Sequence, residues 1–124
     1  RVASRDLGEH FARITGLDSG VCISLSALLG SPKVRRASGF ARLIKHIRHD
    51  EATHVRKSRD HAVELGFDSA HFRDCYALTR TGMVDMLRPI SGSFEALDVD
   101  PEKLFGRLLR FQGQRDGEGR DLID

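Results

Sequence analysis

Apolar residues recur at helical spacing over almost the whole chain, and this periodicity constrains the fold more than any other feature. No stretch of useful length alternates apolar and polar residues in the manner of a β-strand. The prolines Pro32, Pro89 and Pro101 stand between the periodic segments and not inside them. The pattern predicts an all-α protein, and its 124 residues suffice for one small domain.

Turn and capping signals divide the pattern into four predicted helices and a tail. Gly30-Ser31-Pro32 ends the first helix, and Gly66 suits the C-terminal cap of the second. Together the helices form one domain over 1–111, followed by a flexible polar tail over 112–124. The predicted segments are a helix over 4–29, a helix from between Pro32 and Ser38 to Leu65, a helix from Asp68 or Ser69 to Leu87, a polar connection over 90–98 and a short helix from Asp100-Pro101 onward.

Two acidic residues interrupt the apolar faces of the two long predicted helices. At about 100° per residue, Asp18 lies at the centre of an apolar stripe on the first helix and Glu51 on the second. A buried carboxylate is unfavourable unless a cation or hydrogen-bond donors meet it. The stripes are Leu7, Phe11, Ile14, Val21, Cys22, Leu25 and Leu29 around Asp18, and Phe40, Ile44, Ile47, Val55, Ser58, Ala62 and Leu65 around Glu51.

The two acids are predicted to meet. A short connection makes the long helices antiparallel, and with reversal near Val34 the two acids stand at equal distances from the turn. His54 follows Glu51 by three residues, so both project from one side of the helix. Carboxylate and imidazole groups so placed predict a metal site. Asp18 has a second interpretation, because Gly16-Leu-Asp-Ser-Gly20 is also typical of a loop whose aspartate caps a shorter helix.

An acid on one helix and Asp-Glu-x-x-His on its antiparallel partner resembles the second half of a ferritin-like di-iron carboxylate protein. The resemblance implies Asp18 as the lone carboxylate ligand, Glu51 as the bridging one and His54 as the nitrogen ligand. Asp50 would be the neighbouring acid that orients the histidine. The family implies an iron-dependent oxidoreductase that uses O2 on a small organic molecule, or a ferroxidase, with manganese as the alternative metal.

The chain supplies only half of such a ligand set, because it holds no second Glu-x-x-His and an aspartate replaces the usual glutamate. Two routes would complete the set. In a homodimer, two copies would supply four carboxylates and two histidines across a two-fold axis. In a longer parent chain, two missing helices would precede Arg1, which the lack of an initiator methionine favours.

A second ligand assignment uses other residues of the same helix. Asp50 and His54 have the Asp-x-x-x-His spacing of haem-oxygenase-like di-iron oxidases, with His46 one turn before Asp50. Asp50 and His46 lie roughly 100° and 140° from the stripe centre, which favours the first assignment. His61 shares the His54 side two turns later, where a boundary residue is more typical than a ligand.

Two further classes of function fit the sequence. Positive charge concentrates between Lys33 and Arg59, as in helical nucleic-acid-binding or regulatory modules. Asp50 and Asp60 interrupt the run and its arginines spread around the helix, so solvated charge is the simpler interpretation. In a metal-free helical scaffold subunit, a Glu–His pair would instead hold two helices in register.

The sequence favours a cytoplasmic protein without a membrane segment. No apolar run reaches the roughly 18 to 20 residues of a membrane span, and no segment has the pattern of a signal peptide. Cys22 and Cys75 form neither a close pair nor a metal-knuckle spacing, as is usual in a reducing compartment. Gly16, Gly20 and Ser58, beside the acids, either leave room for a substrate or serve packing.

Overall fold

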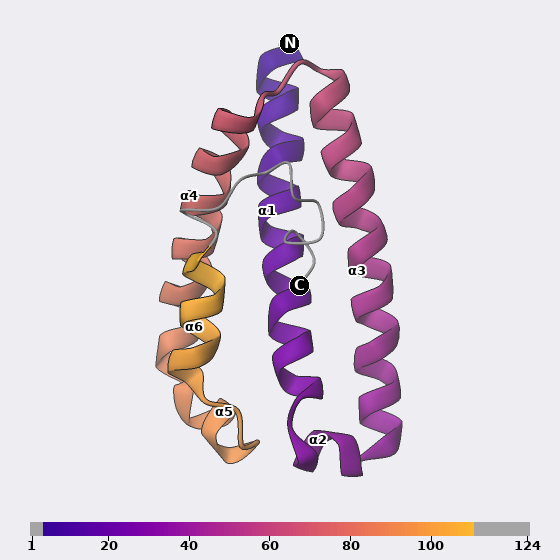
Figure 1. Cartoon of the computed structure of the whole chain (residues 1–124), viewed down its shortest axis with the longest axis vertical. Helices are drawn as coiled ribbons and strands as arrows, with labels where there is room; N and C mark the ends of the chain where they lie inside the picture. The colour runs from indigo at the N-terminus through magenta and orange to yellow at the C-terminus, as the bar shows by residue number, and fades with distance from the viewer. Residues whose placement is uncertain (1–3, 111–124) are drawn as a thin grey trace.

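A computed structural model describes residues 4–110, and within this range the protein is all-α without a β-strand. Two long helices, α1 (Ser4–Leu29) and α3 (Ser38–Glu64), run antiparallel and are joined by the short α2 (Pro32–Arg36) (Figure 1). Helix α4 (Ser69–Leu87) lies along the other side of α1. A 3-10 turn, η1 (Arg88–Ile90), then leads to α5 (Ser91–Ala96) and α6 (Pro101–Leu109).

The helices begin and end at the residues that the capping signals predict. The Asp68 side chain accepts a hydrogen bond from His71 N at the start of α4, and Asp100 caps α6 in the same way. Gly66 has a φ of 87° after α3, a left-handed conformation that glycine adopts without a steric penalty. The bounds predicted for the first helix and the starts of the third and fourth are confirmed.

Two predicted connections differ in the structure. The second predicted helix begins as α3 at Ser38, within the predicted range, but Ser31 caps a separate short helix, α2, before the chain bends at Ala37. The prediction of a polar connection over 90–98 is wrong, because η1 and α5 occupy most of this segment. Phe94 is buried in the core and holds this segment against it, although most residues of the segment are polar. The tail predicted over 112–124 lies outside the described residues.

Helix α1 is the centre of the fold, because it packs against α3 on one side and α4 on the other. Its most buried positions carry small side chains, including Ala12, Thr15 and Ser19. A Cβ added to Gly16 would lie 2.5 Å from Thr79 Oγ1 on α4, so the two backbones approach closely there. Small residues on α1 therefore serve close helix packing on two sides.

The apolar stripe predicted around Asp18 is not the core face of α1. Of that stripe only Cys22 is fully buried, and the remaining residues are partly or largely exposed. The stripe around Glu51 is confirmed as core at Ile44, Val55, Ser58 and Ala62. Phe40 and Ile47 are exposed, and Leu65 is partly buried. Helix α1 places mainly small residues in the core, together with Ile23, so most of its other large apolar side chains are only partly buried.

Arg80 on α4 joins three helices from inside the core. Its side chain is 0% exposed, and its Nε donates to the Gly16 carbonyl of α1 at 3.0 Å. Its Nη1 donates to the Leu108 carbonyl of α6 at 3.3 Å, and its Nη2 donates to Ser19 Oγ. Burial lowers the pKa of Arg80 to about 10, so the guanidinium stays charged at neutral pH.

Helix α1 has the length and composition of a membrane span over Leu7–Leu29, contrary to the expectation from the sequence. Asp18 is the one charged residue between Ile14 and Leu29. Part of this composition serves packing, because 39% of the most apolar window is buried and α1 contacts α3, α4 and α6. The cytoplasmic location stays a prediction.

The substitution Arg80→Leu tests the role of the buried guanidinium. We expect it to lower the free energy of unfolding by about 2 to 4 kcal/mol, because the Gly16 and Leu108 carbonyls lose a buried donor. Urea unfolding followed by circular dichroism measures the change. The control is Arg73→Leu, an exposed position on the same helix, which should change stability by less than about 0.5 kcal/mol. Equal stability of the two variants would contradict the assignment.

Candidate metal centre

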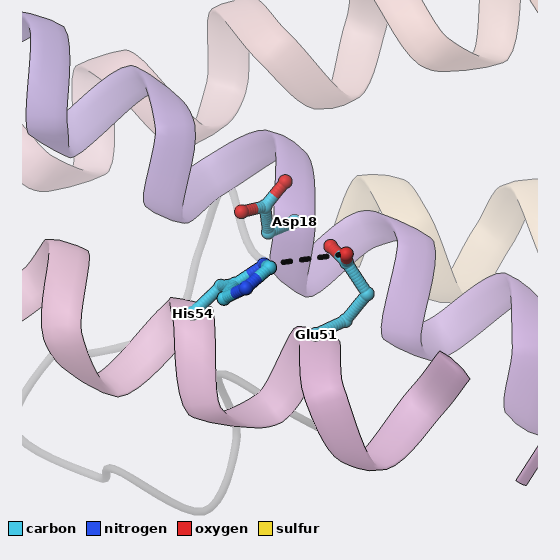
Figure 2. A group of neighbouring side chains, drawn as sticks. All are labelled: Asp18, Glu51 and His54. Carbon is cyan, nitrogen blue, oxygen red and sulfur yellow. Dashed lines mark ion pairs between the residues drawn. The ribbon is translucent and has the colours of Figure 1, made fainter. Parts of the chain in front are cut away.

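Asp18 from α1 and Glu51 and His54 from α3 point toward one another across the interface of the two long helices (Figure 2). Each side chain offers one ligand atom, and these three atoms lie within 4.8 Å of one another. His54 Nδ1 is 3.4 Å from Glu51 Oε1. The structure thus brings together the three residues that the sequence groups, and we call them the triad. Their role as ligands stays a prediction.

The helical registers explain why the triad forms. Glu51 is the middle residue of the 27 in α3, and Asp18 lies near the middle of the 26 in α1. Antiparallel helices of equal length joined by a short turn place their midpoints side by side. Helix α1 continues without interruption through Gly16 and Gly20, so the interpretation of Asp18 as a helix cap is wrong.

The environment of Asp18 opposes its negative charge. Its pKa rises from the ordinary value of 3.8 to about 6, first because it is partly buried and second because the Glu51 carboxylate repels it. A hydrogen bond with the Glu51 side chain also contributes to this rise in pKa, and His54 partly offsets it. Near neutral pH the two helices therefore hold two like charges together, and a cation between them would relieve the repulsion.

The triad lies at the edge of the α1–α3 interface and not deep inside it. The Glu51 side chain is 20% exposed and that of His54 is 58% exposed. Asp18 is also partly buried. The carboxylates face inward from their helices while the imidazole borders on solvent. A metal ion at the triad would thus have protein on one side and an open approach on the other.

The other candidate ligands do not join this group. Asp50 and His46 are exposed on α3, outside the triad, so the structure does not assemble the haem-oxygenase-like set. The ring of His61 packs on the ring of Phe11, with centroids 5.1 Å apart. His61 therefore serves a contact between α1 and α3, as the boundary interpretation predicts.

The small residues beside the acids provide packing and not space for a substrate. Gly16 and Gly20 face α4, where an added Cβ would collide with side chains of Thr79 and Met83. Ser58 is buried between helices. Two hollows of about 370 Å³ lie elsewhere on the described surface, and neither is lined by the triad. They are lined by residues 65–68 with His71, and by Leu29, Arg35, Ser38, Ala41, Arg42 and Lys45.

Cys22 lies next to the triad, one helical turn after Asp18 on α1. The sequence pattern indicated only a core position for it. Burial, followed by the charges of Glu51 and Asp18, raises the pKa of its thiol to about 11. Its Sγ contacts the Arg48 carbonyl at 3.9 Å. The spacing of four residues from Asp18 was the signal available in the sequence. Cys22 is an uncharged thiol and adds no anionic sulfur to the site.

Several basic residues of the run from Lys33 to Arg59 serve the fold. Lys33 Nζ donates to the Ala96 carbonyl and pairs with Asp98. Arg48 donates to Ser26 Oγ on α1, and the Arg59 guanidinium lies 5.7 Å from the centroid of the Phe72 ring. These contacts explain part of the positive charge in this run by helix packing, so a nucleic-acid partner is not needed to explain it.

Comparison of the chain with protein-family models, with curated proteins and with solved structures gives no match. The ferritin-like resemblance therefore depends on the triad and on the two helices that carry it. The all-α fold is shown, whereas membership of that superfamily stays a prediction.

The raised pKa of Asp18 predicts how the metal-free protein responds to pH. Because the folded state holds this proton more tightly than the unfolded chain, stability should fall as the pH rises from about 4 to about 6. Asp18→Asn should remove this component and, after allowance for solvent screening, stabilise the protein at pH 7 by about 1 kcal/mol. Urea unfolding with a chelator at pH 4 and pH 7 measures the difference.

The control for this experiment is Asp50→Asn, which neutralises an exposed acid on α3 outside the triad. We expect its effect on stability to be small at both pH values. An Asp18→Asn variant whose stability relative to wild type is the same at pH 4 and pH 7 would contradict the proposed repulsion.

Proposed function

We propose that Asp18, Glu51 and His54 bind iron, or manganese in its place, and that the protein is an O2-dependent oxidoreductase or a ferroxidase of ferritin-like type. One observation carries the proposal: two carboxylates and an imidazole from two helices offer ligand atoms within 4.8 Å of one another. Iron(II) and manganese(II) accept carboxylate and imidazole ligands together.

The residues fit a metal ion in their charge as well as in their chemistry. Asp18 and Glu51 are partly buried carboxylates that repel each other, and His54 can supply at most one positive charge between them. A divalent cation would neutralise both acids at once. The uncharged Cys22 thiol leaves an oxygen and nitrogen donor set, which suits iron and manganese better than metals that prefer thiolate.

The two long helices hold the donors in place. Glu51 and His54 lie one turn apart on α3, so their spacing is fixed by the helix, and Asp18 approaches from α1. Side chains on packed helices are more precisely positioned than those on loops. Iron, when bound, supplies electron exchange with O2, which none of the three side chains provides. Three donors leave positions of the ion for water, substrate or further protein groups.

The scaffold alternative has less support from the geometry. Glu51 and His54 both lie on α3, so their pair is internal to one helix and cannot by itself hold two helices in register. The contact between helices is made by Asp18 and Glu51, which repel each other when both are ionised. A structural role alone gives no reason for two like charges at this interface.

Metal binding is tested by equilibrium titration of the chelator-treated protein with Mn(II) and, without oxygen, with Fe(II). We expect wild type to bind about one ion per chain, and Glu51→Gln to weaken binding by at least about 10-fold because an anionic ligand is lost. Asp50→Asn, which keeps the triad intact, should bind as wild type does. A wild-type protein that binds no more metal than Glu51→Gln would overturn the proposal.

Redox function is tested separately by exposing Fe(II)-loaded protein to air. We expect the wild-type protein to oxidise Fe(II) faster than the Glu51→Gln variant, because the triad holds the ion beside an exposed approach. Absorbance of the Fe(III) product measures the rate, and protein-free Fe(II) in the same buffer provides the baseline. Equal oxidation rates in the two proteins would contradict the redox function and leave only metal binding for the triad.

A further inference from the structure

Apolar side chains lie exposed around the triad on both long helices. On α3, Phe40, Leu43 and Ile47 are 47%, 55% and 40% exposed and precede Glu51 by one to three turns. On α1, residues at helical spacing on either side of Asp18 are partly exposed. We call this surface the open face, and it consists of Ile14, Val21, Leu25, Phe40, Leu43 and Ile47.

Two basic residues of α3 that are near the open face in sequence lie on another side of the helix. At about 100° per residue, Arg42 and Lys45 lie roughly 140° to 160° from Ile47, on the opposite side of the helix. Helix α1 has no basic residue between Ile14 and Leu29. Exposed apolar residues gathered around an acidic centre are unusual for a surface in water, and such patches mark interaction sites.

We propose that a second copy of this chain docks on the open face and that metal ions held by the two triads join the copies. The proposal rests on the metal-binding function proposed above. The site is incomplete in one copy, because three side chains fill only part of the coordination sphere and His54 remains exposed. A second copy would bring a second triad, giving four carboxylates and two imidazoles between the pair.

The position of the triad favours a second copy over an unrelated partner. Because Glu51 is the midpoint of α3 and Asp18 lies near that of α1, a two-fold axis through the triad superposes the two hairpins along their whole length. The exposed apolar residues of each copy then lie against the other copy, once on each side of the axis. A site near one end of the hairpin would leave the other end of each hairpin uncovered.

The charges make this association depend on the metal. Two triads brought together without a cation would place four carboxylates in an apolar interface, where like charges repel strongly. Divalent ions between the triads convert this repulsion into attraction. The chain should therefore be a monomer in the presence of a chelator and a dimer when metal is bound.

The experiment measures the molar mass of the full chain in solution by light scattering, with EDTA or with Mn(II). We expect 13.8 kDa with EDTA and about twice that mass with Mn(II), because a dimer has two chains. The variant Phe40→Ser/Leu43→Ser changes the open face about two to three turns before Glu51 and should weaken dimerisation at least 10-fold. Its matched control, Leu78→Ser/Met86→Ser, removes exposed apolar residues from α4 and should dimerise as wild type does.

The outcomes separate this inference from the proposed function. A chain that binds Mn(II) but keeps the mass of a monomer overturns the dimer and leaves the metal site intact. A chain that neither binds metal nor dimerises overturns both. A dimer that persists in EDTA, or in Glu51→Gln, overturns the metal linkage. A metal-dependent dimer that tolerates Phe40→Ser/Leu43→Ser but not the α4 variant assigns the interface to another face.

Discussion

The double contact of α1 is the constraint on which the rest of the structure depends. This helix meets α3 on one side and α4 on the other, and close approach on both sides requires small residues such as Ala12, Gly16 and Ser19. Arg80 fixes the arrangement by binding α1 and α6 from α4. Apart from the buried Ile23, most larger apolar residues of α1 are only partly buried, and Asp18 lies among them on the same side of the helix.

The candidate metal centre follows from that arrangement. Because α3 packs against α1 in an antiparallel register, its midpoint brings Glu51 to Asp18, and the helix adds His54 one turn later. The acids are buried enough to raise the pKa of Asp18 and exposed enough to admit an ion from solvent. Two acids at a helix interface destabilise the metal-free protein, and a bound cation would turn the same residues into a stabilising link.

Much of the fold and the grouping of the triad could be predicted from the sequence. Asp68, Asp100 and Gly66 mark helix ends through local hydrogen bonds and backbone conformation, which depend on a few neighbouring residues. The encounter of Asp18 with Glu51 follows from their equal distances to a short turn. Both inferences need only local chemistry and chain length.

The features that the sequence left open depend on tertiary packing. Helical periodicity locates an apolar stripe, but it does not say whether that stripe or the small residues beside it will face the core, and α1 uses the latter. The role of Arg80 needs carbonyl groups from two other helices, one of them 64 residues away in the chain. Helix α5 packs on the core through Phe94. The polar sequence of the segment does not by itself indicate this contact.

Anomalous X-ray diffraction from crystals grown with Mn(II) tests the central claim most directly, because it locates the ion and its ligands together. The account predicts a peak bounded by the carboxylates of Asp18 and Glu51 and the ring of His54, at ordinary coordination distances of about 2.0 to 2.3 Å. An ion bound only elsewhere, or Asp18 and Glu51 turned apart into solvent with none between them, would contradict it.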